Sequence, residues 1–186
     1  MAKTERIILG IDPGTNVMGY GLIKITGNHL ELITLGVLKL AKLGNHPLKL
    51  KRIFERILSL IDEYHPDEMA LEAPFYGKNV QSMLKLGRAQ GVAMAAGLYR
   101  DVTITEYAPR KIKQSITGKG SASKEQISSM VQKLLNFKEE PKYLDATDAL
   151  AVALCHYFQG DKVDSASSKN YNGWASFISN NPDRVK

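Results

Sequence analysis

The sequence predicts one α/β domain built on a mixed sheet, with antiparallel strands first and parallel strands later. Three observations carry this prediction. The chain has 186 residues, which suits a single domain with its own core. About the first forty residues alternate strand and turn signals without a helical pattern. After them, helical periodicity alternates with short apolar runs, as in parallel strands joined by crossover helices.

The predicted sheet begins with residues 7–12, an apolar run that ends in Asp12. Ile and Leu on both faces are typical of a central strand. Pro13 and Gly14 form a turn signal, so Asp12 is expected at the carboxyl end of this strand. A carboxylate there is costly to desolvate unless a backbone nest, a lysine or a metal ion meets it.

Turn residues and apolar periodicity divide the rest of the domain into further elements. The chain order makes the first, fourth and fifth strands parallel and places helices on the faces of the sheet. The expected elements are strands at 18–25 and 29–40 (with Gly36 as a candidate break), a helix from about 50 to 64, a strand at 68–72, a helix over 79–99, a strand at 102–107, a short basic helix over 109–116, and helices over 124–136 and 143–158.

Composition is consistent with an intracellular protein that has a polyanionic partner. The formal net charge is +6 and the sequence pI is about 9.3. Cys155 is the only cysteine, so no intrachain disulfide is possible and a reducing cytoplasmic location is expected. The N-terminus lacks the layout of a signal peptide, and no apolar run is long enough to cross a membrane.

The chain divides into a domain at 1–160 and a polar C-terminal tail at 161–186. Asp, Lys, Ser and Asn dominate the tail, which predicts disorder. Trp174, Phe177 and Ile178 indicate that part of it docks on another surface.

Four carboxylates fall at the ends of predicted elements. Asp12 and Glu72 end strands, and Asp145 and Asp148 share one face of the last helix. Taken singly, they could serve a turn, a lysine pair or a helix cap. If they converge, they repel one another, and divalent cations relieve that repulsion. All-oxygen ligands suit Mg²⁺ or Mn²⁺. Two such ions, about 3.5–4 Å apart, would catalyse phosphoryl transfer.

Basic residues cluster near the predicted carboxylates, either as a solvated surface or as phosphate contacts. The glycine- and serine-containing loop at 118–121 favours phosphate contacts. Phe75 follows Glu72 closely, and it is either a small core plug or a wedge against DNA bases. His156 lies on the Asp145 face but three turns further on, too far to share a metal. The candidate DNA-binding residues are Phe75, Lys78, Lys85, Arg88, Arg110, Lys111, Lys113, Lys119 and Lys124.

Several segments together resemble the RuvC family of Holliday-junction resolvases. The resemblance runs in order from about Ile7 to Phe158, and its motifs lie at 10–14, 71–75, 84–91, 107–124 and 145–151. It implies an RNase H-like fold and Mg²⁺-dependent cleavage of four-way DNA junctions by paired symmetric nicks. It also implies a homodimer that works with the branch-migration proteins RuvA and RuvB.

The resemblance assigns roles to particular residues. Asp12, Glu72, Asp145 and Asp148 match the catalytic acidic positions of the family. Phe75 matches the aromatic residue that inserts at the junction core. Lys113 and Lys124 match basic positions near the scissile phosphate. Two features depart from the family pattern, namely Pro74 directly before Phe75 and the tail at 161–186.

Other readings of the chain remain open at this point. One is a different RNase H-like nuclease that acts on RNA or on simpler DNA. Another is an actin- or Hsp70-like ATPase, but that fold needs a second half for which 186 residues leave no room. A third is a catalytically silent junction-binding module, which the four carboxylates argue against. The Gly- and Ala-rich face of the 79–99 helix is a candidate for dimer packing or for core packing against the sheet.

Overall fold

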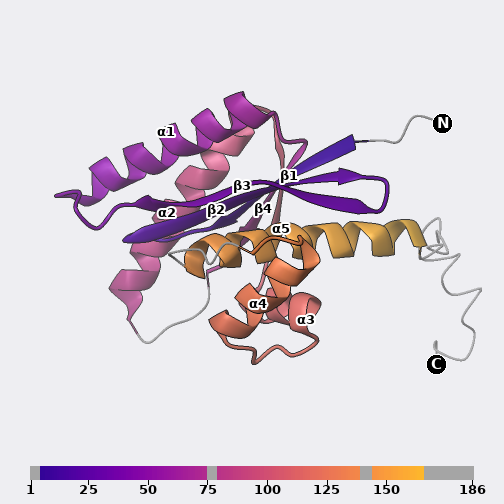
Figure 1. The fold of residues 1–186 in the computed structure, drawn as a ribbon. Helices are drawn as coiled ribbons and strands as arrows, with labels where there is room; N and C mark the ends of the chain where they lie inside the picture. Colours follow the sequence, from indigo (N-terminus) through magenta and orange to yellow (C-terminus); the bar gives the residue numbers. More distant parts are fainter. Residues whose placement is uncertain (1–4, 75–78, 139–143, 166–186) are drawn as a thin grey trace, which may run out of the picture.

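The computed structural model describes residues 5–74, 79–138 and 144–165, with side chains placed up to residue 160. Within these ranges the sheet has five strands in the order β3-β2-β1-β4-β5 (Figure 1). Phe75 and Lys78 lie outside the described residues. The elements are β1 (Glu5–Asp12), β2 (Val17–Thr26), β3 (His29–Lys39), α1 (His46–Tyr64), β4 (Glu68–Glu72), α2 (Val80–Leu98), β5 (Thr103–Tyr107), α3 (Pro109–Thr117), α4 (Lys124–Leu134) and α5 (Leu144–Ser165).

The central strand β1 connects the antiparallel and parallel parts of the sheet. It pairs antiparallel with β2, which pairs antiparallel with β3. On its other side it pairs parallel with β4, and β4 pairs parallel with β5. The predicted mixed sheet, with strands 1, 4 and 5 parallel, is therefore confirmed.

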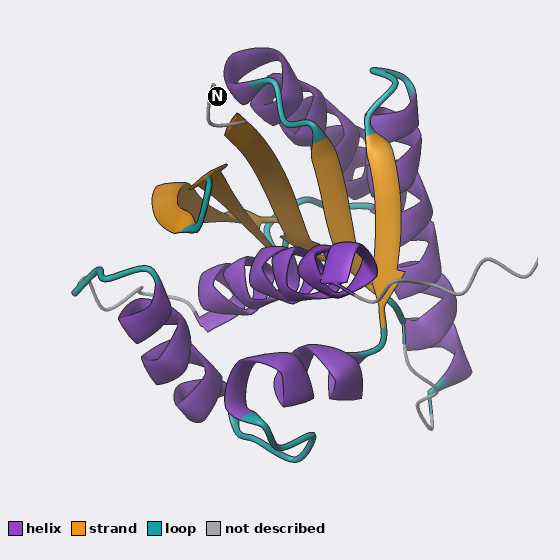
Figure 2. Ribbon diagram, turned by 90° about the vertical axis from the view of Figure 1, so that its right-hand side faces the viewer, coloured by secondary structure: helices purple, strands orange, loops and turns teal. Residues whose placement is uncertain are grey.

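Helices cover both faces of this sheet (Figures 1 and 2). On one face, α1 and α2 bury Leu9 and Ile11 of β1 in a core with Ile53 and Ala93. On the other face, α5 lies across the sheet, and α3 and α4 pack outside it. Because β1 is covered on both sides, its apolar run has no polar face, as expected for a central strand.

Helix α1 begins at His46, earlier than the expected start near residue 50. Asn45 caps it, since its side chain accepts a hydrogen bond from the Leu48 N–H at 3.0 Å. Pro47 occupies the first turn, where a missing N–H costs nothing. The sequence Asn45-His46-Pro47 therefore starts the helix rather than merely ending the preceding strand.

Strand β3 runs through Gly36 without a break, so the candidate interruption there is wrong. Tyr20 of β2 lies opposite Gly36, and its ring occupies the space that a side chain would need. A Cβ on Gly36 would lie 2.4 Å from the Tyr20 hydroxyl oxygen. Gly36 therefore admits a close cross-strand contact, a common role for glycine within a strand. The register shift occurs elsewhere, between Leu22 and Ile23.

Helix α5 continues past Phe158, where the prediction ended it, to Ser165. The predicted domain boundary at residue 160 therefore falls inside a helix. Residues 166–186, the greater part of the predicted tail, lie outside the described residues. Among the helices that the structure describes, none is long and apolar enough to span a membrane.

Candidate metal and nucleic-acid site

Asp12 and Glu72 meet at one edge of the sheet because β1 and β4 are parallel neighbours. Ile11 pairs with Leu71, so each carboxylate follows directly after the last pair of the ladder. The predicted convergence of these two strand ends is confirmed. Each carboxylate is partly buried, so neither is fully solvated.

Helix α5 brings two further carboxylates to this edge by lying directly on the sheet backbone. A Cβ on Gly19 of β2 would lie 1.9 Å from the Asp145 carbonyl oxygen. A Cβ on Gly10 of β1 would lie 2.1 Å from the Ala149 carbonyl oxygen. Glycine at these positions is what permits the approach, because any side chain would displace the helix. The first turn of α5 therefore sits beside the end of β1.

Asp12, Asp145 and Asp148 each offer a carboxylate oxygen, and the three oxygens lie within 4.8 Å of one another. This spacing suits oxygen ligands around one small divalent cation. Glu72 is not one of the three, although its charge acts on Asp12. The predicted four-carboxylate site is thus arranged as a close group of three with Glu72 beside it.

Burial and mutual repulsion disfavour the ionised form of these carboxylates, which a bound cation would stabilise. Burial raises the pKa of Asp12 well above its usual value, and the charges of Glu72 and Asp148 raise it further. Burial and the charge of Asp148 raise the pKa of Glu72 to about 7. Burial also raises the pKa of Asp148, although Lys124 partly opposes this. Desolvated carboxylates that repel one another are the donor set expected of a Mg²⁺ or Mn²⁺ site.

Lys124, the first residue of α4, contacts this acidic group directly. Its Nζ lies 2.6 Å from Oδ2 of Asp148 and 3.1 Å from Oδ1 of Asp145. Burial acts to lower the pKa of Lys124, but the bonds to the two aspartates outweigh it and raise the pKa. Ser123 and Gln126 form a capping box that fixes this end of α4. Sequence reasoning placed Lys124 near phosphate and did not foresee its contact with the aspartates.

A cavity of about 610 Å³ opens beside the carboxylates. Asp12, Glu72 and Asp148 form its acidic part, and Arg110, Lys113 and Lys124 supply cations to the same lining. Acidic metal ligands with basic groups close by suit a phosphodiester that bridges the two. The remaining lining residues are Ala108, Pro109, Ile112, Gly120, Ile127 and Ala151.

The other predicted basic residues lie away from this lining. Lys85 and Arg88 are exposed on α2, which packs on the opposite face of the sheet. Lys111 is exposed on α3, and Lys119 follows it in the loop to α4. These four residues are therefore exposed and lie outside the cavity lining.

Sequence reasoning missed Gln90, a buried residue of α2. Its Nε2 donates to the Glu72 carbonyl oxygen at 3.4 Å and to the Glu106 side chain. It also lines a second cavity of about 90 Å³ beside Asp12 and Glu72. Gln90 therefore supports the end of β4 where Glu72 leaves the sheet. The sequence signal that could have identified Gln90 is a polar amide among the small residues of a helix face that is predicted to pack.

These electrostatics predict that the metal-free protein is more stable at pH 5 than at pH 8. The folded state raises the pKa of Glu72 from the usual 4.5 to about 7, so folding binds a proton in this range. Stability is therefore lost as the pH rises from 4.5 through 7, by a contribution on the order of 3 kcal/mol. Asp12 and Asp148 act in the same direction.

Denaturation in the presence of a chelator at both pH values measures this effect. Glu72→Gln should reduce the difference between the two pH values, because the amide does not titrate. A wild-type protein with equal stability at pH 5 and pH 8 would contradict the assigned electrostatics.

A family model and known proteins that are similar to this chain all carry the same family description. A sequence model of the family described as "Crossover junction endodeoxyribonuclease RuvC" matches residues 8–156. Two proteins of that description are similar over nearly the whole chain. The one from Cytophaga hutchinsonii is 65% identical, over 98% of this chain and 89% of its own length. The one from Bacteroides fragilis is 59% identical, over 98% of this chain and 97% of its own length.

Solved structures agree with the sequence comparison. RuvC of Thermus thermophilus in complex with a Holliday junction substrate aligns with a TM-score of 0.79 at 30% identity, over 85% of this chain and 96% of that one. A yeast mitochondrial resolvase aligns with a TM-score of 0.62 at 13% identity, over 86% of this chain and 80% of that one, and shares the fold.

Proposed function

This chain belongs to the RuvC family of crossover junction endodeoxyribonucleases, and from that premise we propose that it resolves four-way (Holliday) DNA junctions by metal-dependent phosphodiester hydrolysis in recombination and repair. The observation that carries the proposal is the close group of Asp12, Asp145 and Asp148, with Glu72 beside it, at the wall of a cavity that also presents lysines and an arginine. A silent binding module would not need this desolvated acidic group.

The carboxylates would bind metal ions, and the basic residues would bind the phosphate. Asp12, Asp145 and Asp148 would hold an ion, with Glu72 able to contact a second one. Two Mg²⁺ ions, for which Mn²⁺ can substitute, would supply a polarised water nucleophile and charge stabilisation at the leaving oxygen. Arg110, Lys113 and Lys124 orient the scissile phosphate from the same cavity.

The remaining candidate residues contact the junction away from the scissile phosphate. Lys85 and Arg88 on α2, and Lys111 and Lys119 at α3, lie at the surface and suit the backbones of the junction arms. We assign the same role to Lys78, and we assign Phe75 to the junction core, on the family resemblance alone.

Cleavage of a synthetic four-way junction, compared with a linear duplex of the same sequence, tests the proposal. We expect paired symmetric nicks in the junction with Mg²⁺ or Mn²⁺ and none with a chelator. The alternative is another RNase H-like nuclease. Equal cutting of junction and duplex, or a preference for an RNA strand, would favour that alternative and reject junction resolution.

Paired nicks require two sites, and helix α2 offers a surface for a homodimer. The small residues of this helix divide between two faces. Ala89, Ala93 and Ala96 are buried against the sheet, so part of the stripe belongs to the core. Gly87 and Gly91 face open space on the other side of the helix. They lie on the same helix face as three exposed apolar residues, and together these five residues form the exposed stripe of α2. The three apolar residues are Val80 (63%), Leu84 (51%) and Leu98 (61%).

We therefore propose that two copies pack through the exposed stripe of α2, with the two glycines allowing the helices to approach closely. Each subunit would contribute one active site. RuvA and RuvB are the proposed protein partners, on the family resemblance. Chromosomal junction DNA as the substrate implies work in the cytoplasm.

Leu84→Arg should convert the dimer into monomers. An unpaired charge within the stripe would be desolvated in the dimer, which weakens association by at least about thirtyfold. Analytical ultracentrifugation measures this directly. Gln81→Arg, which adds the same charge at another exposed position of α2, is the matched control and should leave the dimer intact. A dimer that persists in Leu84→Arg would place the subunit contact elsewhere.

A further inference from the structure

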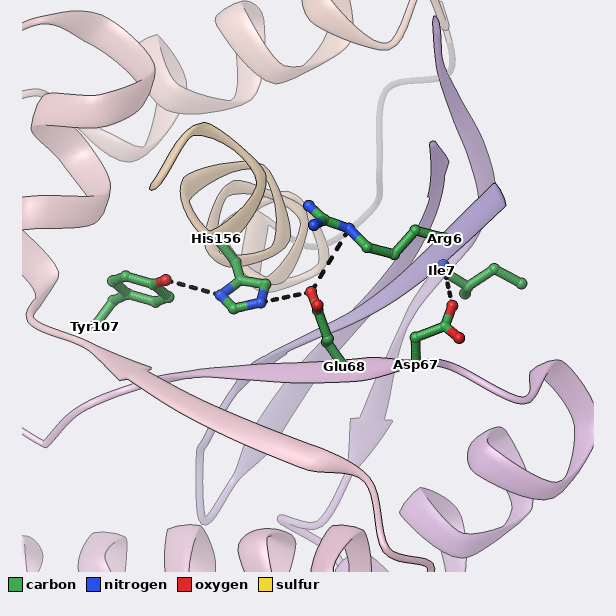
Figure 3. Close-up of polar contacts among 6 residues, drawn as sticks. All are labelled: Arg6, Ile7, Asp67, Glu68, Tyr107 and His156. Atoms are coloured by element: carbon green, nitrogen blue, oxygen red, sulfur yellow. Dashed lines mark hydrogen bonds and ion pairs between the residues drawn. The ribbon is translucent and has the colours of Figure 1, made fainter. Parts of the chain in front are cut away.

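His156 forms a polar link between helix α5 and two strands of the sheet (Figure 3). Its Nε2 lies 2.8 Å from Oε2 of Glu68, at the start of β4. Its Nδ1 lies 2.8 Å from the hydroxyl of Tyr107, at the end of β5. The side chain of His156 is only 14% exposed, so both bonds are shielded from water.

The partners fix the arrangement of protons in this link. Glu68 accepts, so in the neutral imidazole Nε2 of His156 carries the hydrogen and Nδ1 accepts from the Tyr107 hydroxyl. Burial, with the charges of Cys155 and Glu68, raises the pKa of Tyr107 to about 12, which keeps the phenol protonated as a donor. The Nε of Arg6, on β1, lies 3.7 Å from Oε2 of Glu68, so the arginine places a positive charge beside this carboxylate. Both ring nitrogens of His156 are therefore paired.

The link involves α5, which carries Asp145 and Asp148, and β4, which carries Glu72. Strand β4 carries Glu68 at its start and Glu72 at its end. Helix α5 carries Asp145 in its first turn and His156 eleven residues later, which puts the two on nearly the same face. Helix α5 therefore comes close to β4 at two places: the charge of Asp148 acts on Glu72, and His156 bonds to Glu68.

Apolar contacts between α5 and the sheet supply no directional restraint of their own. Between these two places the helix rests on the sheet through Ala149, Leu150 and Ala153, over Gly10 and Gly21. Such contacts are favourable wherever apolar surface is buried, and they impose no donor–acceptor geometry. Hydrogen bonds have strict distance and angle limits, so the bonds of His156 select one position and rotation of the helix.

We propose that His156 is a positioning residue of the metal site, which holds α5 in register with β4 so that Asp145 and Asp148 meet Asp12 at ligand spacing, with Glu72 beside them. This inference rests on the proposed function, since it concerns the same carboxylates. We expect replacement of His156 to lower ion affinity and turnover. Junction binding should not depend on it, because the basic residues of the cavity lie on α3 and α4.

Mn²⁺ binding measured by electron paramagnetic resonance, without DNA, tests the proposal. His156→Leu should weaken Mn²⁺ affinity about tenfold, in the range found for residues that orient metal ligands. It should lower kcat for junction cleavage by a similar factor and leave KM unchanged. His156→Gln should stay within about threefold of wild type, because its amide can donate to Glu68 and accept from Tyr107.

Val152→Ala is the matched control for general loss of stability. Val152 is a fully buried residue one turn before His156, and its truncation leaves the polar link intact. It should lower Tm without changing Mn²⁺ affinity. If His156→Leu does not fold, Tyr107→Phe takes its place, since it removes one hydroxyl and should weaken Mn²⁺ affinity at least about threefold.

The outcomes separate this inference from the proposed function. Wild-type protein that binds no Mn²⁺ at Asp12 would reject the metal site itself. Wild-type binding with unchanged affinity in His156→Leu, or in Tyr107→Phe where that variant replaces it, would overturn the positioning role alone. An equal loss of affinity in Val152→Ala would overturn it as well, because stability rather than register would then be the cause. Nitrogen NMR should show hydrogen on Nε2 of His156 and none on Nδ1, and the reverse would also contradict the link.

Discussion

Asp12→Asn is expected to abolish junction cleavage, by about a thousandfold or more, while junction binding is retained. Asp12 supplies one of the three close oxygens of the acidic group, and a neutral amide is a poor ligand for a hard cation. Loss of several kcal/mol of stabilisation of the transition state accounts for a factor of this size. Binding should change little, because the cationic side chains of the cavity remain.

The same substitution should make the metal-free protein more stable at pH 8. Burial and neighbouring charges raise the pKa of Asp12, so its ionised form is a cost to the folded state above its usual pKa. The amide removes that cost. A loss of activity together with a gain in Tm distinguishes a functional carboxylate from a structural one.

Single-turnover cleavage, gel-shift binding and thermal denaturation with a chelator measure the three effects together. Asp101→Asn is a suitable control, because Asp101 is exposed and belongs to neither cavity lining. It should behave as wild type in all three assays. Cleavage by Asp12→Asn at the wild-type rate would exclude this carboxylate from the reaction.

Gly19→Ala should lower the stability of the protein by about 3 kcal/mol, which corresponds to a fall in Tm of about 10 °C. The added methyl group would lie 1.9 Å from the Asp145 carbonyl oxygen, and this neighbour is helix backbone that cannot rotate away. The first turn of α5 must therefore move from the sheet. Because that turn carries Asp145 and Asp148, Mn²⁺ affinity should fall with it.

Gly44→Ala provides the matched control for this substitution. Gly44 has no heavy atom within 4 Å of the position that a Cβ would take, so the methyl group should be tolerated. Denaturation and Mn²⁺ titration of both variants give the comparison. A stable Gly19→Ala protein with wild-type metal affinity would show that the close approach of α5 does not set the site.

The sequence allowed much of the fold and the acidic site to be predicted, because these features depend on local signals. The apolar run before Asp12 and the Pro13-Gly14 turn fixed the end of the central strand, and the same reasoning applied to Glu72. The spacing of Asp145 and Asp148 placed them on one helix face. Parallel neighbouring strands then required Asp12 and Glu72 to meet, as the structure confirms.

Contacts that depend on how particular side chains pack between elements could not be predicted. From the sequence alone, Gly36 suggests a break in the strand. The strand is unbroken because the ring of Tyr20, on the neighbouring strand, fills the space beside this glycine. The contact of Lys124 with Asp145 and Asp148 depends on how α4 packs against α5. The position of His156 relative to Asp145 was predicted correctly, but its bonds to the sheet depend on where α5 crosses the strands.

Anomalous X-ray scattering from crystals grown with Mn²⁺ tests most directly the central claim that the acidic group is a metal-dependent catalytic centre. We expect a strong peak within about 2.3 Å of oxygens from Asp12, Asp145 and Asp148, with Lys124 displaced from at least one aspartate. Asp12→Asn crystals grown in the same way should lose the peak. A Mn²⁺ ion bound elsewhere, with Lys124 still paired to both aspartates, would contradict the claim.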